Sequence, residues 1–324
     1  MYGIAVSSRG QTTTDHEGLT TTKSILEGII NISKPFGPTS FSVVESVRRV
    51  IGAKKAGHIG TLDPIAEGIL PVAIGKATKL IPFIHGQQKK YIFEIKWGEK
   101  TSTDDSEGVV INTSKRLPKE EEINEKLKNF LGYIDQTPPK ASAVKINGKR
   151  AYQLLRENKN IELKPKKVFV SKIKLLNSID KHYSTFEIEC GKGFYVRAFA
   201  RDLAESLGTF GHIVALKRAK VGLFAIETAI LLDDLIKIRQ THQEFNFIHS
   251  SVSMLDDILA YEVVEKEDLK NLSLGKSIIL NLNNLIKPLL NSVDKKLVFL
   301  SCKGNIISYG KLNNDLFIPK KILL

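Results

Sequence analysis

The segment 58–71 places an acidic side chain where no regular helix or strand explains it. Pro64 disfavours the helical conformation for the residue before it, so the sequence predicts an extended backbone at Asp63. Gly60 and Gly68 bound the loop, permit tight turns and let another molecule approach closely. This pattern fits either a turn in which Asp63 accepts hydrogen bonds from nearby N–H groups or a loop that presents Asp63 for chemistry.

Charge and composition limit the class of partner. The chain has 324 residues, of which 42% are hydrophobic, and this length favours two domains at about 100 to 200 residues each. Its 48 Lys and Arg against 35 Asp and Glu give a net charge of +13, which suits a nucleic acid or an anionic membrane surface. No apolar stretch approaches the roughly 18 residues of a membrane-spanning helix, so we do not expect an integral membrane protein. Nothing in the sequence supports a peripheral membrane partner, and we expect none.

The two cysteines, Cys190 and Cys302, are far apart and have neither Cys-x-x-Cys spacing nor His-rich neighbours. The sequence therefore predicts neither a disulfide framework nor a metal site. Because this usage fits a reducing compartment, we expect a cytoplasmic protein.

Three segments with different patterning divide the chain. Residues 1–24 are rich in Thr and Ser, lack an apolar core and predict a disordered leader. Residues 25–248 carry both strand-like and helix-like patterns and predict one large domain. Residues 249–324 follow a polar segment and contain short strand patterns around a Lys-Gly-Asn turn, which predict a small β-rich module.

Within the large domain some elements have clear local signals. A helix is expected to begin near Thr39 and to end at Gly52, since apolar residues recur between them at helical spacing. Residues 89–98 alternate apolar and polar side chains and predict a half-buried strand with Tyr91 on its apolar face. Residues 136–165 follow no regular period and include a turn rich in positive charge, a pattern that by itself fits a solvated basic loop.

Several short sequence blocks of this chain resemble blocks of one protein family and occur in the same order. The block at 58–71 shows the closest resemblance. The corresponding family motif reads Gly-His-x-Gly-x-Leu-Asp-Pro-x-Ala-x-Gly-x-Leu-Pro. The other blocks are residues 31–35, 37–40, 90–91, 191–197 and 201–204. On these blocks the chain resembles the TruB family, the tRNA pseudouridine synthases, over roughly residues 25 to 225.

The resemblance implies a fold and an activity. The expected fold is an α/β domain with a mixed, largely antiparallel sheet and a central active-site cleft flanked by helices, followed by a small PUA-like RNA-binding module at 249–324. The implied activity is isomerisation of uridine-55 in the T-arm of tRNA to pseudouridine. That reaction breaks the N1 glycosidic bond, rotates the uracil and rejoins it through C5. The insertion at about 136–165 is expected to grip the RNA.

The resemblance also assigns catalytic residues. Asp63 is the expected nucleophile, and attack on the ribose C1′ and attack on the uracil C6 both stay open. A buried carboxylate needs a cation to stay ionised, and Arg197 matches the arginine that pairs with the catalytic aspartate in the family. Tyr195 is expected to pack against the target base and is a candidate for late proton abstraction. Tyr195 and Arg197 can point the same way only if the backbone between them is extended, so their geometry stays open.

The expected substrate-binding residues surround an everted uridine. Tyr91 is the candidate for stacking on the base, and Lys90 precedes it. His58 is expected to occupy the emptied stack or to contact RNA, and Leu216 resembles a pocket-lining leucine. Lys34 is expected to support the Asp63 loop. No metal and no organic cofactor is needed, and we expect a monomer without an obligate protein partner.

Competing interpretations differ in catalysis or in partner. One is a guide-RNA-dependent pseudouridine synthase acting in a ribonucleoprotein, although the chain lacks the long basic tails expected there. Another is a non-catalytic RNA-binding or tRNA-folding module that retains the fold. A phosphatase with an aspartate nucleophile is disfavoured, because no second carboxylate cluster for Mg²⁺ is evident near Asp63 in the sequence.

Overall fold

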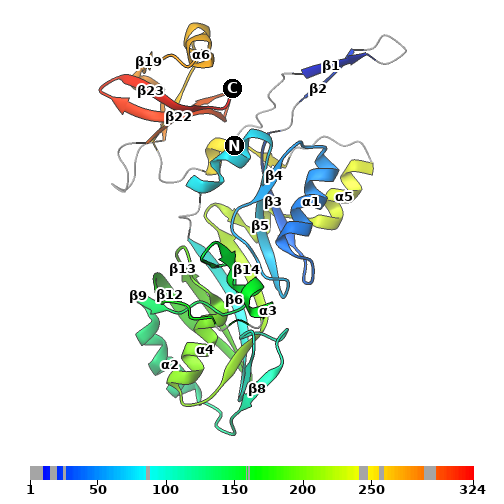
Figure 1. Cartoon of the computed structure of the whole chain (residues 1–324), viewed down its shortest axis with the longest axis vertical. Helices are drawn as coiled ribbons and strands as arrows, with labels where there is room; N and C mark the ends of the chain where they lie inside the picture. Colours follow the sequence, from blue (N-terminus) through cyan, green and yellow to red (C-terminus); the bar gives the residue numbers. More distant parts are fainter. Residues whose placement is uncertain are drawn as a thin grey trace.

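A large mixed sheet forms the body of the molecule (Figure 1). The computed structural model describes residues 10–14, 20–24, 27–84, 88–157, 159, 161–240, 247–254, 259–287 and 297–324. Within these residues the sheet has eleven strands, eight of them in the order β16-β3-β5-β14-β6-β13-β12-β9. The strands are β3 (Gly28–Lys34), β4 (Ala56–His58), β5 (Ala66–Ile74), β6 (Lys89–Trp97), β9 (Gly132–Gln136), β12 (Lys166–Asp180), β13 (Tyr183–Cys190), β14 (Gly211–Val221), β15 (Phe224–Ala225), β16 (Ile230–Leu231) and β17 (Ile248–His249).

Most neighbouring strands in this sheet are antiparallel. The parallel pairs are β14 with β5 and β16 with β3, whereas β5 pairs antiparallel with β3, and β6 pairs antiparallel with both β13 and β14. The prediction of a mixed, largely antiparallel sheet is therefore confirmed. The predicted alternation in β6 is also confirmed, because Tyr91, Phe93, Ile95 and Trp97 are buried in one core.

Helices cover the sheet and place its loops. Helix α1 begins with its N-cap at Thr39, whose hydroxyl accepts a hydrogen bond from the Ser42 N–H at 3.1 Å, and it ends at Gly52, where φ is 73°. These boundaries agree with the predicted ones. The helices are α1 (Ser40–Ile51), α2 (Glu120–Leu127), α3 (Ala151–Arg156), α4 (Val196–Ser206), α5 (Leu232–Gln240) and α6 (Lys266–Ser273). Short 3₁₀ segments span Gly75–Phe83, Lys128–Phe130, Ile226–Thr228, Ser251–Met254 and Leu282–Asn284.

Three small hairpins stand apart from the two larger sheets. They are β1 (Gly10–Thr14) with β2 (Thr20–Ser24), β7 (Glu99–Thr101) with β8 (Val110–Thr113), and β10 (Lys145–Ile146) with β11 (Lys149–Arg150). The first lies within residues 1–24, and the disordered leader predicted for that segment stays a prediction. The remaining leader residues lie outside the described part of the chain.

The predicted insertion leaves the sheet and returns to it at two residues that pair with each other on neighbouring strands. Gln136 at the end of β9 pairs with Lys166 at the start of β12. The intervening residues hold the β10–β11 hairpin and helix α3. An excursion of this kind can move or bind without disturbing the strands that support it.

The C-terminal part forms a second sheet at one end of the molecule (Figure 1). Its strand order is β19-β23-β22-β21-β18-β20. The strands are β18 (Leu259–Glu262), β19 (Ile278–Ile279), β20 (Leu285–Lys287), β21 (Val298–Cys302), β22 (Asn305–Asn313) and β23 (Leu316–Ile322). The predicted small β-rich C-terminal module is confirmed as a fold, whereas the predicted domain boundary at 248/249 stays a prediction.

The two sheets share a hydrophobic core. Ile29 and Ile69 from the large sheet belong to the same buried cluster as Phe299, Ile306 and Leu323 from the second sheet. The module is therefore packed onto the large sheet rather than merely linked to it.

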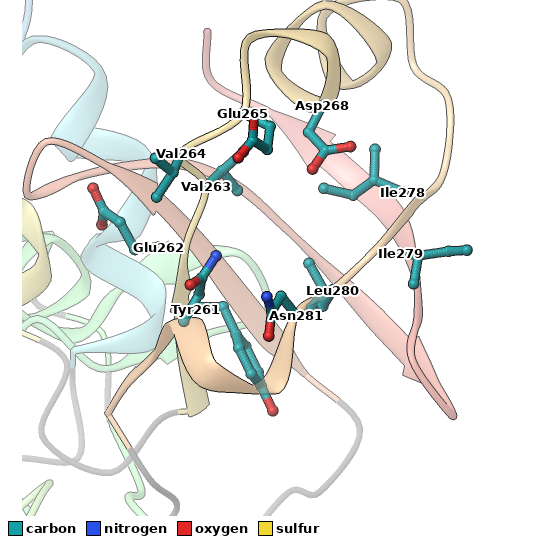
Figure 2. Close-up of a pocket in the computed structure, with 11 residues that line it drawn as sticks. Tyr261, Glu262, Val263, Val264, Glu265, Asp268, Ile278, Ile279, Leu280 and Asn281 are labelled. Carbon is teal, nitrogen blue, oxygen red and sulfur yellow. The ribbon is translucent and has the colours of Figure 1, made fainter.

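A pocket in the C-terminal module is acidic rather than basic (Figure 2). Its charged lining residues are Glu262, Glu265 and Asp268, and the rest of the lining is apolar or amide in character apart from Tyr261. Such a pocket does not suit an RNA phosphate. Within the described residues, no helix is both long and apolar enough to span a membrane.

Candidate active site

The loop that carries Asp63 is fastened on both sides by buried side chains. The guanidinium of Arg218 in β14 donates to the carbonyls of Gly60 at 3.0 Å and Thr61 at 3.3 Å, which precede Asp63, and to that of Ile69 at 2.7 Å, which follows it. Arg218 is only 1% exposed. A buried arginine satisfied by backbone carbonyls fixes the course of the chain that leads into Asp63.

On the C-terminal side, a lysine fills the equivalent role. The Lys34 ammonium donates to the carbonyls of Pro64 at 3.2 Å and Ala66 at 2.6 Å. Ser40 adds a two-way contact from α1, since its hydroxyl donates to the Leu62 carbonyl and accepts from the Leu62 N–H, both at 2.8 Å. The backbone on both sides of Asp63 is thus held by residues from β3, α1 and β14.

The glycines of the loop meet real steric demands. Gly60 has φ of 82° and Gly68 has φ of 100°, in the region that side chains rarely adopt. A Cβ on Gly68 would also collide with the backbone of Arg218, which pairs with it across the parallel β5–β14 contact. Glycine at 68 therefore lets β14 approach closely enough for Arg218 to reach the loop.

Asp63 itself is half-buried and paired with Arg197. Its Oδ2 lies 2.9 Å from Nη2 of Arg197, and the carboxylate is 37% exposed while the guanidinium is 5% exposed. Arg197 also contacts a second carboxylate, since its Nη1 lies 3.1 Å from Oδ2 of Asp105. Carbonyls of Thr103 and Ala141 accept its remaining hydrogen bonds at 3.0 and 3.1 Å. One buried cation is therefore shared by two acids, one exposed and one enclosed.

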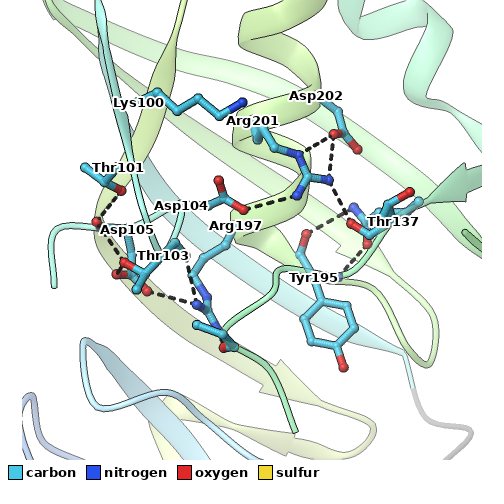
Figure 3. Close-up of polar contacts among 12 residues, drawn as sticks. Lys100, Thr101, Thr103, Asp104, Asp105, Thr137, Tyr195, Arg197, Arg201 and Asp202 are labelled. Carbon is cyan, nitrogen blue, oxygen red and sulfur yellow. Dashed lines mark hydrogen bonds and ion pairs between the residues drawn. The ribbon is translucent and has the colours of Figure 1, made fainter. Parts of the chain in front are cut away.

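A second arginine one turn along α4 braces the same acidic turn (Figure 3). Nη1 of Arg201 lies 3.1 Å from Oδ2 of Asp104, and its Nη2 donates to the Thr137 carbonyl at 2.7 Å. Residues 197 and 201 are four apart, so they lie on one face of the helix. Consecutive aspartates, with Asp104 at φ of 62°, thereby meet consecutive turns of α4.

Tyr195 is held through its backbone rather than its ring. The Gln136 side chain accepts from the Tyr195 N–H at 2.8 Å and donates to the Tyr195 carbonyl at 3.0 Å. Tyr195 is the N-cap of α4 with φ of −115°, whereas Arg197 is already helical. The geometry left open by the sequence is thus a mixture of extended and helical backbone. In Figure 3 the Tyr195 ring points away from the Arg201–Asp202 pair.

The tyrosines of the predicted site are un-ionised phenols. Burial raises the pKa of Tyr195, and the negative charge of Asp63 raises it further. Burial also raises the pKa of Tyr91, although a hydrogen bond with Arg218 and its charge partly oppose this. Burial lowers the pKa of Lys34 to about 8, and the Asp63 charge opposes that shift.

Comparison with known proteins identifies the family. Residues 48–196 match the family model described as TruB family pseudouridylate synthase (N terminal domain). A tRNA pseudouridine synthase B of Nitrobacter winogradskyi is 39% identical over 305 residues, covering 93% of this chain and 83% of that protein. This chain belongs to the TruB family. A relative of the same name from Caulobacter sp. strain K31 is 44% identical over 79% of this chain and 82% of its own length.

Solved structures show that the TruB-family fold extends over nearly the whole chain. A Cbf5-Nop10-Gar1 complex contains a chain that matches with a TM-score of 0.70 at 24% identity, covering 99% of this chain and 93% of that one. The archaeal box H/ACA sRNP Nop10-Cbf5 complex gives a TM-score of 0.66 at 23% identity, covering 93% and 87%. The predicted pseudouridine synthase fold is thereby confirmed.

Several of the site residues predicted from sequence lie close together in the structure. Asp63 and Arg197 are in direct contact. Leu216 is buried and pairs with Ala66, three residues after Asp63. His58 ends β4, two residues before Gly60.

Lys90 is the predicted residue that lies apart. Its ammonium forms an ion pair with Glu187 at 2.8 Å. Neighbouring residues of a strand point to opposite faces, so Lys90 and the buried Tyr91 diverge. Glu187 also has Lys172 and Lys174 within 3.8 Å, which makes the Lys90 face a surface ion-pair cluster.

Sequence reasoning missed several residues that shape this site. Asp105, Gln136, Arg201 and Arg218 come from segments far from Asp63 in the chain. For the acidic turn, the signal in the sequence was two consecutive aspartates, together with two arginines four residues apart elsewhere in the chain. Among the described residues, no group of three or more His, Cys, Asp or Glu side chains is arranged to hold a metal ion.

Proposed function

We propose that this TruB-family protein isomerises uridine-55 in the T-arm of tRNA to pseudouridine. The observation that carries the proposal is the Asp63 carboxylate, presented on a fastened loop 2.9 Å from a buried arginine. The relatives named tRNA pseudouridine synthase B, similar over most of the chain, supply the substrate class.

Asp63 acts as the nucleophile in this proposal. On the C1′ route, a carboxylate oxygen bonds to ribose C1′ while the N1–C1′ bond breaks and its electron pair stays on uracil. The uracil rotates, C5 attacks C1′ and displaces Asp63, and the C5 proton is then removed. Attack on uracil C6 is the alternative. Arg197 binds Oδ2, and we assign the attack to Oδ1.

The tyrosines position the base in this proposal. Because the pKa of Tyr195 is raised, its neutral phenol is better suited to pack against uracil and donate a hydrogen bond than to act as a base. Tyr91 offers its ring for stacking, with its hydroxyl tied to Arg218. Leu216 lines the pocket, His58 contacts RNA beside it, and Lys34 supports the nucleophile's loop.

The insertion contributes the phosphate contacts. Lys140, Lys145, Lys149 and Arg150 are basic, and within the described structure Lys145, Lys149 and Arg150 form the β10–β11 hairpin. We assign residues 25–248 to catalysis, 136–165 to RNA grip and 249–324 to a PUA-like RNA-binding domain. Action on tRNA as a monomer, without a protein partner, in the cytoplasm completes the proposal.

The decisive experiment incubates the purified protein with an unmodified tRNA transcript and maps pseudouridine by chemical adduct formation. Product at position 55 without added guide RNA supports the proposal and separates it from a guide-dependent enzyme. Asp63→Asn should lower the single-turnover rate by at least about a thousandfold, because an amide cannot replace the nucleophile.

Binding of the same transcript provides the control. Asp63→Asn should bind tRNA within about twofold of wild type, since the change is isosteric and Arg197 keeps Asp105 as a partner. If wild-type protein binds tRNA but forms no pseudouridine, the protein is a binding module instead. If Asp63→Asn still forms product at the wild-type rate, Asp63 is not the nucleophile.

A further inference from the structure

Two phenylalanines project into solvent next to the Asp63 loop. Phe36 is 66% exposed and Phe41 is 71% exposed. Single exposed apolar residues are common on protein surfaces. These two are only five residues apart, and the segments that carry them are bonded to the residues on either side of Asp63.

The backbone next to Phe36 is hydrogen-bonded to the residue on the C-terminal side of Asp63. The carbonyl of Pro35 accepts a hydrogen bond from Lys34 at 2.9 Å, and the N–H of Gly37 donates to the Pro64 carbonyl at 2.9 Å. The backbone on both sides of Phe36 is therefore fixed, and Pro64 directly follows Asp63. The backbone that carries the ring is therefore held next to the Asp63 loop.

Phe41 is held from the N-terminal side of Asp63. The preceding residue, Ser40, bonds both backbone groups of Leu62, which directly precedes Asp63. Phe41 lies in the first turn of α1, whose inner face is formed by Val43, Val44 and Val47. Its ring is thus displayed on the outer face of a helix that is itself bonded to the nucleophile's loop.

We propose that Phe36 and Phe41 contact nucleobases of the RNA loop beside the everted uridine. This inference rests on the proposed function. Everting one nucleotide leaves its neighbours with exposed π-faces, and aromatic side chains stack on such faces irrespective of base identity. Rings whose backbone is already fixed lose little entropy on binding, which favours contact with a substrate.

Charge supports RNA as the occupant. The first turn of α1 contains no acidic residue, and its last turn carries Arg49 and Arg48, of which Arg48 is paired with Glu45 at 2.8 Å. The chain as a whole has a net charge of +13. An apolar protein partner would have to cover the entrance to Asp63 and would compete with the substrate. RNA can use the rings and reach Asp63 at the same time.

The test measures binding of a T-arm stem-loop in the Asp63→Asn background, where no turnover occurs. Phe36→Ala and Phe41→Ala should each raise the Kd by about fivefold or more, as expected for a lost base–aromatic contact. Phe→Tyr at either position should keep the Kd within about twofold, and Phe→Leu should fall between. A fluorescent base analogue next to the target uridine should be less quenched with the Phe→Ala variants.

A matched control comes from the far edge of the sheet. Tyr133 is 73% exposed, and its strand β9 is six strand positions from β3. Tyr133→Ala should leave both the Kd and the analogue fluorescence unchanged. Thermal unfolding of each variant verifies folding, which the exposure of both phenylalanines should preserve.

The outcomes separate this inference from the proposed function. If wild-type protein forms pseudouridine but both Phe→Ala variants bind RNA within twofold of their parent, the rings do not contact RNA and the inference is wrong. If wild-type protein forms no pseudouridine, the proposed function itself fails, whatever the binding data. A loss of binding that Phe→Tyr does not restore would equally exclude base stacking.

Discussion

Arg197 illustrates how one residue can serve both structure and chemistry. It is buried, and it neutralises Asp63 on the exposed side and Asp105 on the enclosed side. Asp105 has further bonds of its own, from the Thr103 hydroxyl and the Glu107 N–H. We infer that Asp105 orients the guanidinium, which leaves Asp63 with a fixed partner.

Removing the charge of Asp105 should therefore impair catalysis without impairing RNA binding. Asp105→Asn preserves the shape of the side chain but lets the Arg197 guanidinium shift towards Asp63. A small displacement in the active site can lower kcat by about tenfold to a hundredfold. Loss of the buried pair should also lower the free energy of unfolding by about 1–3 kcal/mol. Single-turnover kinetics measure the loss of rate, and denaturant unfolding measures the loss of stability. Asp135→Asn, at an exposed position on β9, is the control, and an unchanged kcat in Asp105→Asn would contradict the orienting role.

Lys34 should make the rate depend on pH. With its pKa lowered to about 8, Lys34 is charged below pH 8 and neutral above it. Above that pH, Asp63 loses a nearby positive charge and its loop loses a charge-assisted donor, so kcat/KM should decline with an apparent pKa of about 8. Lys34→Arg stays protonated and should lack this decline.

The same ionisation has a defined effect on stability. Because the folded-state pKa lies below the usual value of 10.5, the unfolded chain binds more protons between pH 8 and 10.5. The contribution of Lys34 to the free energy of unfolding therefore rises with pH across that window and is constant below it. A pH–rate profile of Lys34→Arg that keeps the alkaline decline would assign the decline to another group.

At the scale of elements, strand β9 sets the start of helix α4. The Gln136 side chain bonds both backbone groups of Tyr195. Farther along the chain, the carbonyls of Thr137 and Ala141 accept hydrogen bonds from Arg201 and Arg197. The start of the insertion and the start of α4 are thus one assembly.

Loss of the Gln136 clamp should lower kcat more than it raises KM. Gln136→Leu leaves the Tyr195 N–H and carbonyl unpaired, which frees the tyrosine and is expected to reduce kcat by about tenfold or more. Gln136→Glu keeps the acceptor for the Tyr195 N–H and should lose less activity. Steady-state kinetics on tRNA measure the split. Gln88→Leu, at an exposed position, controls for loss of an amide, and equal effects on kcat and KM would argue for a merely structural role.

At the scale of the whole molecule, the two sheets are joined by a shared core. Phe299 of β21 is fully buried and its ring lies 5.3 Å from that of Phe83 and 5.6 Å from that of Tyr309. Phe83 belongs to the 3₁₀ segment that follows β5, so the C-terminal module contacts the catalytic domain through this segment. The module therefore contributes stability to the catalytic sheet.

Truncating Phe299 should destabilise the large sheet from a distance. Phe299→Ala is expected to cost about 3–5 kcal/mol, and Trp97, the single tryptophan, reports on unfolding of the large sheet by fluorescence. We expect the Trp97 transition to shift to lower denaturant. Phe317→Ala, in the core that belongs to the C-terminal module alone, should shift it far less. An unmoved Trp97 transition in Phe299→Ala would mean that the sheets unfold independently.

The sequence by itself determined the elements and the chemistry-bearing loop, since these depend on neighbours a few residues apart. The proline after Asp63, the glycines around it, the alternation of β6 and the limits of α1 are all local signals. Only the tertiary structure decided which side chains surround Asp63. Arg218 reaches Gly60 across 158 positions of sequence, and Gln136 reaches Tyr195 across 59. The pairing of strands brings such residues together, and no local pattern specifies which of the chain's many charges will meet.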